Sequence, residues 1–367
     1  MKIVIFGLTI SSSWGNGHAT LWRGLCRALS ERGHTIVFFE RDVPYYAAHR
    51  DPFEIPRCEI VLYEAWPLVR TCAAQHVADA DVVIVTSYCP DALAASDLAL
   101  DAGGISVFYD LDTPVTLSRL GSGEEVAYVG PSGLADFDLV LSYTGGQALN
   151  ELRGRLGARR ALPLYGHVDP HQHRRTEPVP HYRSDLSYLG TYAADRQAAL
   201  AELLLEPARR LPDKRFVIGG AQYPPEFPWC QNLFFVQHLP PAEHPAFFSS
   251  SRLTLNITRK AMREWGWCPS GRLFEAAACG TAVLSDAWHG LESFFSPGEE
   301  IIVAEDARQA ISALELDEPE IERIGRNARD RVLSEHTSAC RAEDLLRALE
   351  AACHPVSVPT EMAALEV

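Results

Sequence analysis

The stretch PSGRLFEAAACGTAVLSD, from Pro269 to Asp286, predicts a short helix, a glycine turn and a buried strand in immediate succession. Ser270 is a favourable N-cap and Gly280 a favourable helix stop. Thr281–Leu284 then forms an apolar run with β-branched residues, which favours a strand. Such a succession is a unit of an α/β fold, in which helices connect parallel strands.

Two charged side chains near the start of this helix are candidate ligand contacts. A helix N-terminus presents free N–H groups and a positive dipole end, and both suit a diphosphate. Arg272 could add a forked, charge-assisted contact, and Glu275, about one turn further along, could accept hydrogen bonds from ribose hydroxyls. On spacing alone, a surface helix with two solvated charges is an equal alternative.

Strand and helix patterns alternate along the chain and then restart. The first series of strands is expected at Ile3–Phe6, Thr35–Glu40, Val82–Thr86, Ile105–Tyr109 and Leu139–Ser142, with helices at Thr20–Arg32, Leu68–Ala78 and Asp91–Asp101. The second series is expected at Leu186–Leu189, Phe216–Gly219, Phe234–Gln237, Leu253–Ile257, Ala282–Ser285 and Ile301–Ala304, with helices at Ala194–Arg210, Ala242–Ser250 and Ser270–Ala278. Continuous apolar strands joined by helices predict parallel sheets covered on both faces.

A segment rich in proline and histidine, Pro163–Pro180, separates the two series and is the expected interdomain linker. We therefore expect a Rossmann-like N-terminal domain over residues 1–170 and a second one over residues 171–340. Helical patterns at Glu320–Glu335 and Arg341–Ala352 end the fold. Residues 354–367 are expected to form a disordered tail.

The composition is that expected of a soluble two-domain protein. A chain of 367 residues exceeds one ordinary core, and 47% hydrophobic residues are enough to bury two. The net charge of −15 argues against a nucleic-acid or anionic-membrane surface, and neither a spanning helix nor a signal peptide is expected. The nine cysteines include no C-x-x-C pair, which indicates a reduced, cytoplasmic protein. The oligomeric state is left open.

Several further stretches share their pattern with one family. They are Ser12–Arg23 (SSWGNGHATLWR), Arg32–Arg50 (RGHTIVFFERDVPYYAAHR), Tyr109–Pro114 (YDLDTP), Leu189–Arg196 (LGTYAADR) and Leu253–Arg259 (LTLNITR). With Pro269–Asp286, they resemble the CgeB-like family of bacterial glycosyltransferases over roughly residues 1–350. The resemblance implies the α/β GT-B fold, in which two Rossmann-like domains face each other across a cleft and the second is like that of glycosyl transferases group 1. It also implies that the last helix, residues 341–352, packs back on the first domain.

The resemblance implies a sugar-transfer reaction. The donor would be a nucleotide-diphosphate sugar, the acceptor is unknown, and no cofactor is expected besides this co-substrate. In the family, a glutamate at the place of Glu275 binds the donor ribose. A GT-B sugar-nucleotide epimerase, or a non-catalytic module that binds nucleotide sugars, is the alternative.

In the second half, the donor is expected at loops that follow strands, since ligands favour the carboxyl ends of parallel strands. The candidates from strand ends and from the helix start are Gly190, Thr191, Tyr192, Gly219, Gly220, Asn256, Thr258, Arg259, Lys260, Ser270, Arg272 and Glu275. The resemblance adds His238 and Leu239, at the place where related proteins hold the base through backbone contacts. Arg259 and Lys260 are equally expected as solvated charges.

The first strand is followed by a glycine-rich loop, Gly15-Asn16-Gly17-His18. With Glu40 at the end of the second strand, it could form a dinucleotide-binding unit. However, Thr20 replaces the third glycine of that fingerprint, and eight residues separate the strand from the first glycine. We therefore favour a loop whose glycines let a sugar or diphosphate approach the backbone.

His18 is the candidate catalytic base, because the near-neutral intrinsic pKa of imidazole lets it accept a proton from an acceptor hydroxyl. Asp110 and Asp112 follow a strand and are expected in the same cleft, where one of them could orient His18. This arrangement resembles inverting GT-B enzymes in which an aspartate backs such a histidine. The structural alternative is that His18 caps a helix or packs a loop, and that the aspartates form a turn before Pro114.

Two further patterns bear on mechanism. Asp110-Leu111-Asp112 matches the D-x-D metal motif, but we expect no required metal, because a GT-B cleft neutralises the diphosphate with helix ends and basic side chains. Many retaining GT-B transferases carry a second glutamate at the place that Trp267 occupies here. Glu264 is off register by three residues, so the stereochemistry stays open.

Overall fold

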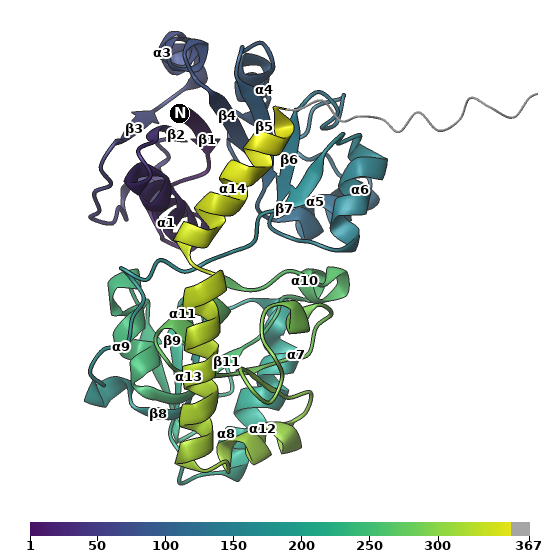
Figure 1. Cartoon of the computed structure of the whole chain (residues 1–367). Helices are drawn as coiled ribbons and strands as arrows, with labels where there is room; N and C mark the ends of the chain where they lie inside the picture. Colours follow the sequence, from purple (N-terminus) through teal and green to yellow (C-terminus); the bar gives the residue numbers. More distant parts are fainter. Residues whose placement is uncertain (354–367) are drawn as a thin grey trace, which may run out of the picture.

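The computed structural model describes residues 1–353 and contains two α/β domains, each built on a sheet (Figure 1). The first sheet has the order β3-β2-β1-β4-β5-β6-β7, with β1 (Lys2–Gly7), β2 (Thr35–Arg41), β3 (Cys58–Tyr63), β4 (Val82–Thr86), β5 (Ile105–Asp110), β6 (Leu139–Ser142) and β7 (Ala161–Pro163). The second has the order β10-β9-β8-β11-β12-β13, with β8 (Ser184–Leu189), β9 (Phe216–Gly220), β10 (Leu233–Gln237), β11 (Ser251–Asn256), β12 (Ala282–Ser285) and β13 (Ile302–Val303). All their strand pairs are parallel, as predicted.

Helices connect these strands. The first domain contains α1 (His18–Glu31), α2 (Pro44–Ala47), α3 (Trp66–Ala78), α4 (Ala92–Leu100), α5 (Thr113–Gly121) and α6 (Gln147–Leu156). The later helices are α7 (Gln197–Leu200), α8 (Glu206–Arg210), α9 (His244–Ser249), α10 (Lys260–Trp265), α11 (Gly271–Ala278), α12 (Ala307–Leu314), α13 (Glu318–Glu335) and α14 (Ser338–Ala352). Within residues 1–353, none of them combines the length and the apolar composition that crossing a membrane requires. The tail predicted at residues 354–367 lies outside the described residues.

The sequence prediction missed the two edge strands of the first sheet. β3 exposes part of its side chains, and β7 has only three residues and ends at a proline. Neither therefore shows the continuous apolar run that marks a strand buried on both faces. Helices α2, α5, α6, α10 and α12 were also missed.

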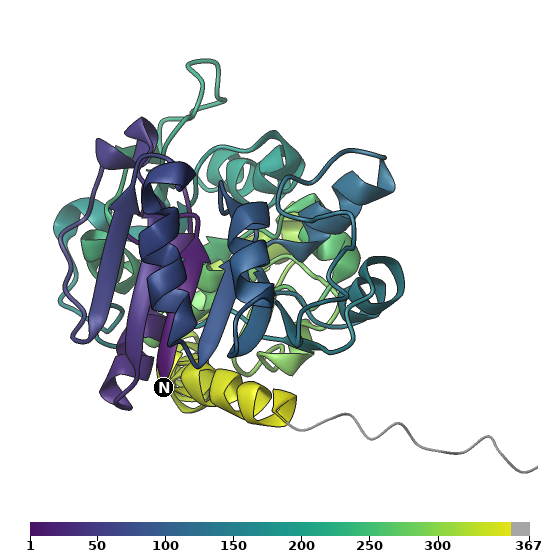
Figure 2. The ribbon, with the colours of Figure 1, turned by 90° about the horizontal axis from the view of Figure 1, so that it is seen from above.

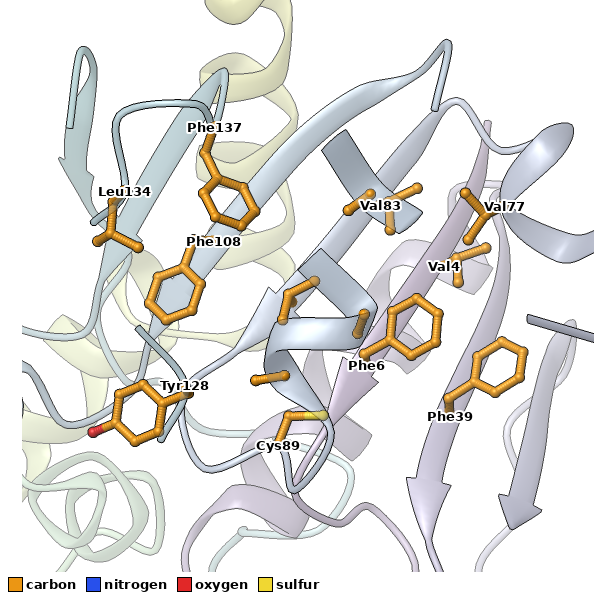
Figure 3. Close-up of a cluster of buried hydrophobic side chains, with 14 of the residues drawn as sticks. Val4, Phe6, Phe39, Val77, Val83, Cys89, Phe108, Tyr128, Leu134 and Phe137 are labelled. Carbon is orange, nitrogen blue, oxygen red and sulfur yellow. The ribbon is translucent and has the colours of Figure 1, made fainter. Parts of the chain in front are cut away.

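Alternate residues of the central strand β1 face opposite sides of the first sheet. Val4 and Phe6 pack into the cluster of Figure 3, together with residues of α3 and α4. Ile3 and Ile5 pack on the other side, together with residues of α1 and α14. Because helices cover both faces, the strand is apolar from Ile3 to Phe6. Helix α14 lies along the first domain, where the chain arrives from the second (Figures 1 and 2).

The strand order positions the loops that carry the site. In the first sheet it reverses between β1 and β4, and in the second between β8 and β11. In open parallel sheets, a crevice forms at the carboxyl ends of the strands that flank such a switch point. The loops after these four strands are therefore the expected ligand loops of each domain.

Two chain crossings join the domains, and they are hydrogen-bonded to each other. Val168, in the first crossing, donates its N–H to the carbonyl of His336 at 3.0 Å and accepts from the N–H of Ser338 at 2.8 Å. The side chain of Arg341, which is 5% exposed, hydrogen-bonds to both crossings near this point. It donates to the carbonyl of Gly166 at 3.3 Å and to His336 Nδ1 at 2.7 Å. Burial and the charge of Arg341 lower the pKa of His336 to about 3, so its ring is neutral and can accept this hydrogen bond.

We expect Arg341→Met to lower the free energy of unfolding by about 2–4 kcal/mol, because it leaves buried acceptors without a donor. Arg347→Met is the matched control, since this arginine pairs with Asp344, as Arg341 does, but has a side chain that is 71% exposed. The control should change the free energy by less than about 0.5 kcal/mol. Urea unfolding measures both, and equal effects of the two variants would contradict the assigned importance of Arg341.

Candidate active site

The loop after β1 is held by the carboxylate of Glu40, at the end of β2. Its oxygens accept from the backbone N–H groups of Ile10 at 2.7 Å and Ser11 at 2.9 Å. They also accept from the hydroxyls of Thr9 at 2.9 Å and Ser11 at 2.6 Å. Glu40 is 1% exposed, so no ribose can reach it. The dinucleotide-binding alternative needs this carboxylate for a ribose, and the loop already occupies it.

Asn16 and its flanking glycines shape the start of α1. The Asn16 Oδ1 accepts from the N–H of His18 at 3.0 Å, and its Nδ2 donates to the carbonyl of Ser12 at 3.0 Å. Gly15 has a φ of +67°, where a side chain would be strained. Gly17 is the N-cap of α1 and has open space where a Cβ would stand. The Asn16 side chain thus stabilises the loop through hydrogen bonds, whereas Gly17 leaves open space next to the backbone.

His18, the first residue of α1, has a partly buried ring whose Nδ1 has no hydrogen-bond partner. Burial lowers its pKa to about 4, so the imidazole is neutral at pH 7 and able to accept a proton. The ring lies edge-on to Tyr88 at 5.9 Å between centroids, and the Tyr88 hydroxyl donates to Asp112 Oδ2 at 3.0 Å. The predicted hydrogen bond of His18 with Asp110 or Asp112 is therefore not formed among residues 1–353. Asp112 accepts a hydrogen bond from Tyr88 instead.

The two aspartates differ in their surroundings. Asp110 ends β5 and is fully buried, and its Oδ1 accepts from the N–H of Asp112 at 3.1 Å. Burial raises the pKa of Asp110 to about 6. Burial also raises the pKa of Asp112, against the hydrogen bond from Tyr88 and the charge of Arg259. Asp110 thus holds the turn before α5, whereas Asp112 lies near an arginine of the second domain.

Further contacts bring the two domains together around this region. The ring of Trp14 lies 4.0 Å from that of His238, and the Tyr143 hydroxyl donates to the carbonyl of Pro269 at 2.9 Å. Pro269 precedes α11, so the second contact places the start of that helix against the first domain. The carboxyl edges of the two sheets therefore face each other.

Trp267 fills the space between the domains beside this edge. A Cβ at Gly146 of the first domain would lie 2.3 Å from its indole, and a Cβ at Gly290 of the second would lie 2.6 Å from it. The place where many retaining transferases carry a glutamate is therefore an interdomain packing position. Glu264 does not replace that acid, since its side chain is 61% exposed and pairs with Lys260 at 3.8 Å.

Helix α11 presents an unpaired arginine. Ser270 precedes the helix without a side-chain cap, so the first N–H groups stay available. Arg272 has no hydrogen bond or ion pair with residues 1–353. Burial raises the pKa of Tyr143 and of Tyr223, and it lowers the pKa of Arg196. The positive charge of Arg272 lowers the pKa of each of these three groups, so Arg272 lies near all of them. Arg272 therefore lies where the first domain meets the loops after β8 and β9, and it forms no ion pair with a carboxylate of the described residues.

Glu275, one turn further along α11, faces two histidines. Its Oε1 lies 4.0 Å from His173 Nε2, and its Oε2 lies 4.0 Å from His244 Nδ1. Burial lowers the pKa of each histidine to about 4. One ligand atom from each of these three residues lies within 4.8 Å of the others, which is close enough for a shared metal ion. Sequence reasoning missed both histidines, although the histidine-rich linker was a signal for His173.

The glycines at the carboxyl ends of β8 and β9 are required by close backbone approach. A Cβ at Gly220 would lie 2.0 Å from the carbonyl oxygen of Gly190. A Cβ at Gly219 would lie 3.1 Å from Leu189. His238 donates its N–H to the carbonyl of Gly220 at 2.7 Å, and Leu239 beside it is buried.

Two residues that sequence reasoning missed shape the loop after β8. Arg196 is 9% exposed and donates to the carbonyl of Thr191 at 2.7 Å. The ring of Tyr223 packs against that of Tyr192 at 5.7 Å, and its hydroxyl donates to the carbonyl of Gly190 at 3.1 Å. Thr191 and Tyr192 are therefore held in place as part of the crevice.

The loop after β11 is fixed by Asp286 rather than left free. Asp286 Oδ1 accepts from the N–H of Thr258 at 3.0 Å and from its hydroxyl at 2.9 Å. Asn256 donates to Ser285 Oγ at 3.0 Å. Arg259 pairs with Asp195 at 3.3 Å, and its side chain is 46% exposed. Of the predicted basic residues, Arg272 is thus the one without an acidic partner among residues 1–353.

A cavity of about 470 Å³ lies at the opposite edge of the second sheet. It is lined by residues at the amino ends of β8, β11 and β12, including Ser184, Ser251 and Ala282, together with arginines. Ligand crevices of parallel sheets lie at the carboxyl edge, so this cavity is not part of the candidate site.

We expect Glu40→Gln to lower the free energy of unfolding by about 2–3 kcal/mol, because an amide cannot accept all the hydrogen bonds that the buried carboxylate accepts. The freed loop should also become sensitive to limited proteolysis between β1 and α1. Glu59→Gln, on the exposed side of the neighbouring β3, is the control and should leave both measurements unchanged. An intact, protease-resistant loop in Glu40→Gln would contradict this assignment.

Comparison with known proteins agrees with this architecture. Residues 196–347 match a family model described as glycosyl transferase-like. No curated protein matches the chain in sequence. The match begins just after the first strand of the second sheet and runs into α14, so it contains the helix that carries Arg272 and Glu275.

Solved structures resemble the chain over nearly its whole length. Sucrose-phosphate synthase from Thermosynechococcus elongatus is 17% identical, with a TM-score of 0.71, and the match covers 96% of this chain and 99% of the other. HepE from Anabaena in complex with UDP-glucose is 14% identical, with a TM-score of 0.67 and coverage of 96% and 100%. An α-glucosyltransferase in complex with UDP and a 13-mer DNA is 13% identical, with a TM-score of 0.68 and coverage of 95% and 99%. The molecule has the GT-B fold, with a glycosyl transferase-like region in its second half.

Proposed function

We propose that the chain is a glycosyltransferase that moves a sugar from a nucleotide-diphosphate sugar to an acceptor. The observation that carries this proposal is Arg272, an arginine without an acidic partner among residues 1–353, at the N-terminus of α11 and inside the glycosyl transferase-like region. A diphosphate would supply the missing negative charge, and the free N–H groups of the helix would bind it further. The similar structure of HepE with UDP-glucose supports a donor of this kind.

Glu275 would bind the hydroxyls of the donor ribose, one helical turn away from the diphosphate. The close-packed glycines Gly190 and Gly220 would let the ends of β8 and β9 approach each other and so shape the loops that hold the donor. The base would lie against the backbone at His238 and Leu239. In this arrangement the second domain holds the nucleotide, and the first domain presents the acceptor.

His18 would act as general base on the first domain. The acceptor hydroxyl gives its proton to the neutral imidazole, its oxygen forms the bond to the anomeric carbon, and the bond from that carbon to the diphosphate breaks. Arg272 and the α11 N-terminus would stabilise the charge that develops on the leaving nucleoside diphosphate. With these groups in place, the reaction would need no metal.

Three finer assignments are part of this proposal. Sequence stretches in both domains support a CgeB-like enzyme. All nine cysteines are free thiols, which supports a cytoplasmic location. The α-glucosyltransferase complexes contain DNA, but the net charge of −15 favours an acceptor other than nucleic acid for this chain.

Incubation with a set of nucleotide sugars tests the proposal. Release of nucleoside diphosphate with transfer or hydrolysis supports a transferase. An altered sugar on an intact nucleotide would instead show an epimerase, and binding without any reaction would show a non-catalytic module. A thermal-shift panel of UDP, dTDP, GDP, ADP and CMP identifies the base, since a ligand that binds the folded state raises its stability.

Arg272→Ala and Glu275→Gln should each weaken binding of the preferred nucleoside diphosphate by about 1–3 kcal/mol, because each removes a charged hydrogen-bond partner. Arg326→Ala on α13 is the control, since that side chain is 61% exposed and makes only a helical ion pair. Isothermal titration calorimetry measures all three affinities. Wild-type affinity in both of the first two variants would rule out the donor site.

His18→Ala should lower the transfer rate by about 10²–10⁴ while nucleotide affinity stays unchanged, because the nucleotide belongs to the other domain. Asp112→Asn should have a smaller effect, since it acts on His18 through Tyr88. His181→Ala, which changes an exposed histidine before the amino end of β8, should be neutral. Because burial lowers the pKa of His18 to about 4, protonation of this base should not reduce kcat/KM until the pH falls toward that value.

A His18→Ala enzyme that folds normally and transfers sugar at the wild-type rate would refute the base assignment. Such a result would favour a retaining mechanism, in which no side chain needs to deprotonate the acceptor.

A further inference from the structure

A buried cluster joins the interdomain linker to the donor helix. His173 comes from the first chain crossing, His244 is the first residue of α9, and Glu275 belongs to α11. The proposed transfer reaction uses the glutamate alone. His173 is 3% exposed, and the side chains of His244 and Glu275 are each 15% exposed. The two imidazole rings lie 5.9 Å apart and are directed at opposite oxygens of one carboxylate.

The hydrogen bond on the far side of His244 decides which of its nitrogens carries the proton. His244 Nε2 lies 3.3 Å from the carbonyl oxygen of Leu239, and a carbonyl can only accept, so Nε2 carries the hydrogen. Nδ1 of the neutral ring then presents a lone pair. That lone pair faces Glu275 Oε2 at 4.0 Å and has no hydrogen-bond partner among residues 1–353. Two electron-pair donors therefore face each other with no hydrogen between them.

His173 is also left without hydrogen-bond partners. Neither of its ring nitrogens has a hydrogen-bond partner among the described residues, and Nε2 faces Glu275 Oε1 at 4.0 Å. Leaving polar groups unsatisfied in a buried site is costly. A single cation placed between the three groups would accept electron pairs from all of them.

The donor set selects the kind of cation. Two imidazole nitrogens and a carboxylate are ligands of Zn²⁺ and similar transition metals, whereas Mg²⁺ and Ca²⁺ prefer oxygen ligands. Metal–ligand bonds of about 2.1 Å place tetrahedral ligand atoms about 3.4 Å apart. The nitrogen–oxygen separations of 4.0 Å would shorten by about 0.6 Å on binding, which side-chain rotation can supply. The hydrogen bond from His244 Nε2 to the Leu239 carbonyl orients the ring. Histidines that bind metals commonly make such a hydrogen bond with their other ring nitrogen.

We propose that His173, His244 and Glu275 bind one Zn²⁺-class divalent cation, and that this cation and the donor ribose exclude each other because both need Glu275. The cation site stands on the geometry of the cluster alone. The exclusion rests on the proposed function, in which Glu275 binds the ribose. The cation would therefore act as an inhibitor that also ties the interdomain linker to α9 and α11, and transfer itself would proceed without it.

Metal binding is tested on the full chain without a histidine tag, after treatment with EDTA. Titration with Co²⁺ alone should produce a visible d–d absorption band that saturates at one equivalent of Co²⁺. Zn²⁺ should abolish this band by displacing Co²⁺, whereas Mg²⁺ should leave it unchanged. His173→Gln and His244→Gln should each lower Zn²⁺ affinity at least tenfold. His171→Gln is the matched control, because this histidine lies two residues from His173 but has a side chain that is 71% exposed.

A measurement on the wild type keeps the test independent of variant folding. Long-range ¹H–¹⁵N spectra should show that Zn²⁺ shifts His244 Nδ1 while Nε2 stays protonated. Absence of metal binding, or equal Zn²⁺ affinity in His171→Gln and His244→Gln, would overturn the cation site. If a water molecule rather than a cation lies between the three groups, no metal binding will be observed.

The exclusion is tested with UDP. At a Zn²⁺ concentration about 100 times its Kd, apparent UDP affinity should fall about 100-fold in the wild type, as mass action requires. In His244→Gln, which should bind Zn²⁺ at least tenfold more weakly, UDP affinity should fall by no more than about 11-fold at the same Zn²⁺ concentration, and this comparison also controls for metal bound to UDP itself. Unchanged UDP affinity in the wild type would overturn the exclusion while leaving the cation site in place. Failure of the whole nucleotide panel to bind the metal-free wild type would instead overturn the proposed function.

Discussion

The two hydrogen-bonded chain crossings are the constraint on which the candidate site depends. Each domain builds half of the site at the carboxyl edge of its own sheet, and neither half is complete alone. Val168 pairs with His336 and Ser338, and Arg341 binds carbonyls and a ring nitrogen at the same point. The two crossings are therefore held to each other at a single point. The distance between His18 on one side and Arg272 on the other is therefore set by this point and by the contacts across the cleft.

Packing across the cleft also limits the chemistry. Trp267 occupies the space between Gly146 and Gly290, where a side chain larger than glycine would collide with the indole. At Trp267 the chain therefore lacks the glutamate that many retaining transferases carry there.

Charge is distributed unevenly over this cleft. Burial keeps His18 neutral and raises the pKa of Asp110, so the first domain offers proton acceptors more than fixed charge. On the second domain, Arg272 stands at the N-terminus of α11 and forms no ion pair with an acidic side chain of residues 1–353. Although the whole chain is strongly acidic, this part of the surface is suited to an anion, and Glu275 next to it is suited to hydroxyl groups or to a cation.

The sequence by itself determined the fold class, and it named most of the residues of the candidate site. Apolar runs alternating with helical patterns predicted two parallel sheets, and the stretch from Pro269 to Asp286 predicted α11 with its arginine and glutamate at the correct end. These features depend on local patterns, because strand and helix periodicity is set within a few residues. Short edge strands such as β7 escaped prediction because their burial is decided by neighbours rather than by their own composition.

Only the tertiary structure decided which side chains meet. The carboxylate of Glu40 holds the loop after β1, Tyr88 stands between His18 and Asp112, and the pair His173 and His244 faces Glu275. In each case the partners come from separate elements, and no local pattern links a histidine in a linker to a glutamate on a helix about a hundred residues later. Such contacts arise from the way the elements pack, so the residue types could be named in advance but not their pairing.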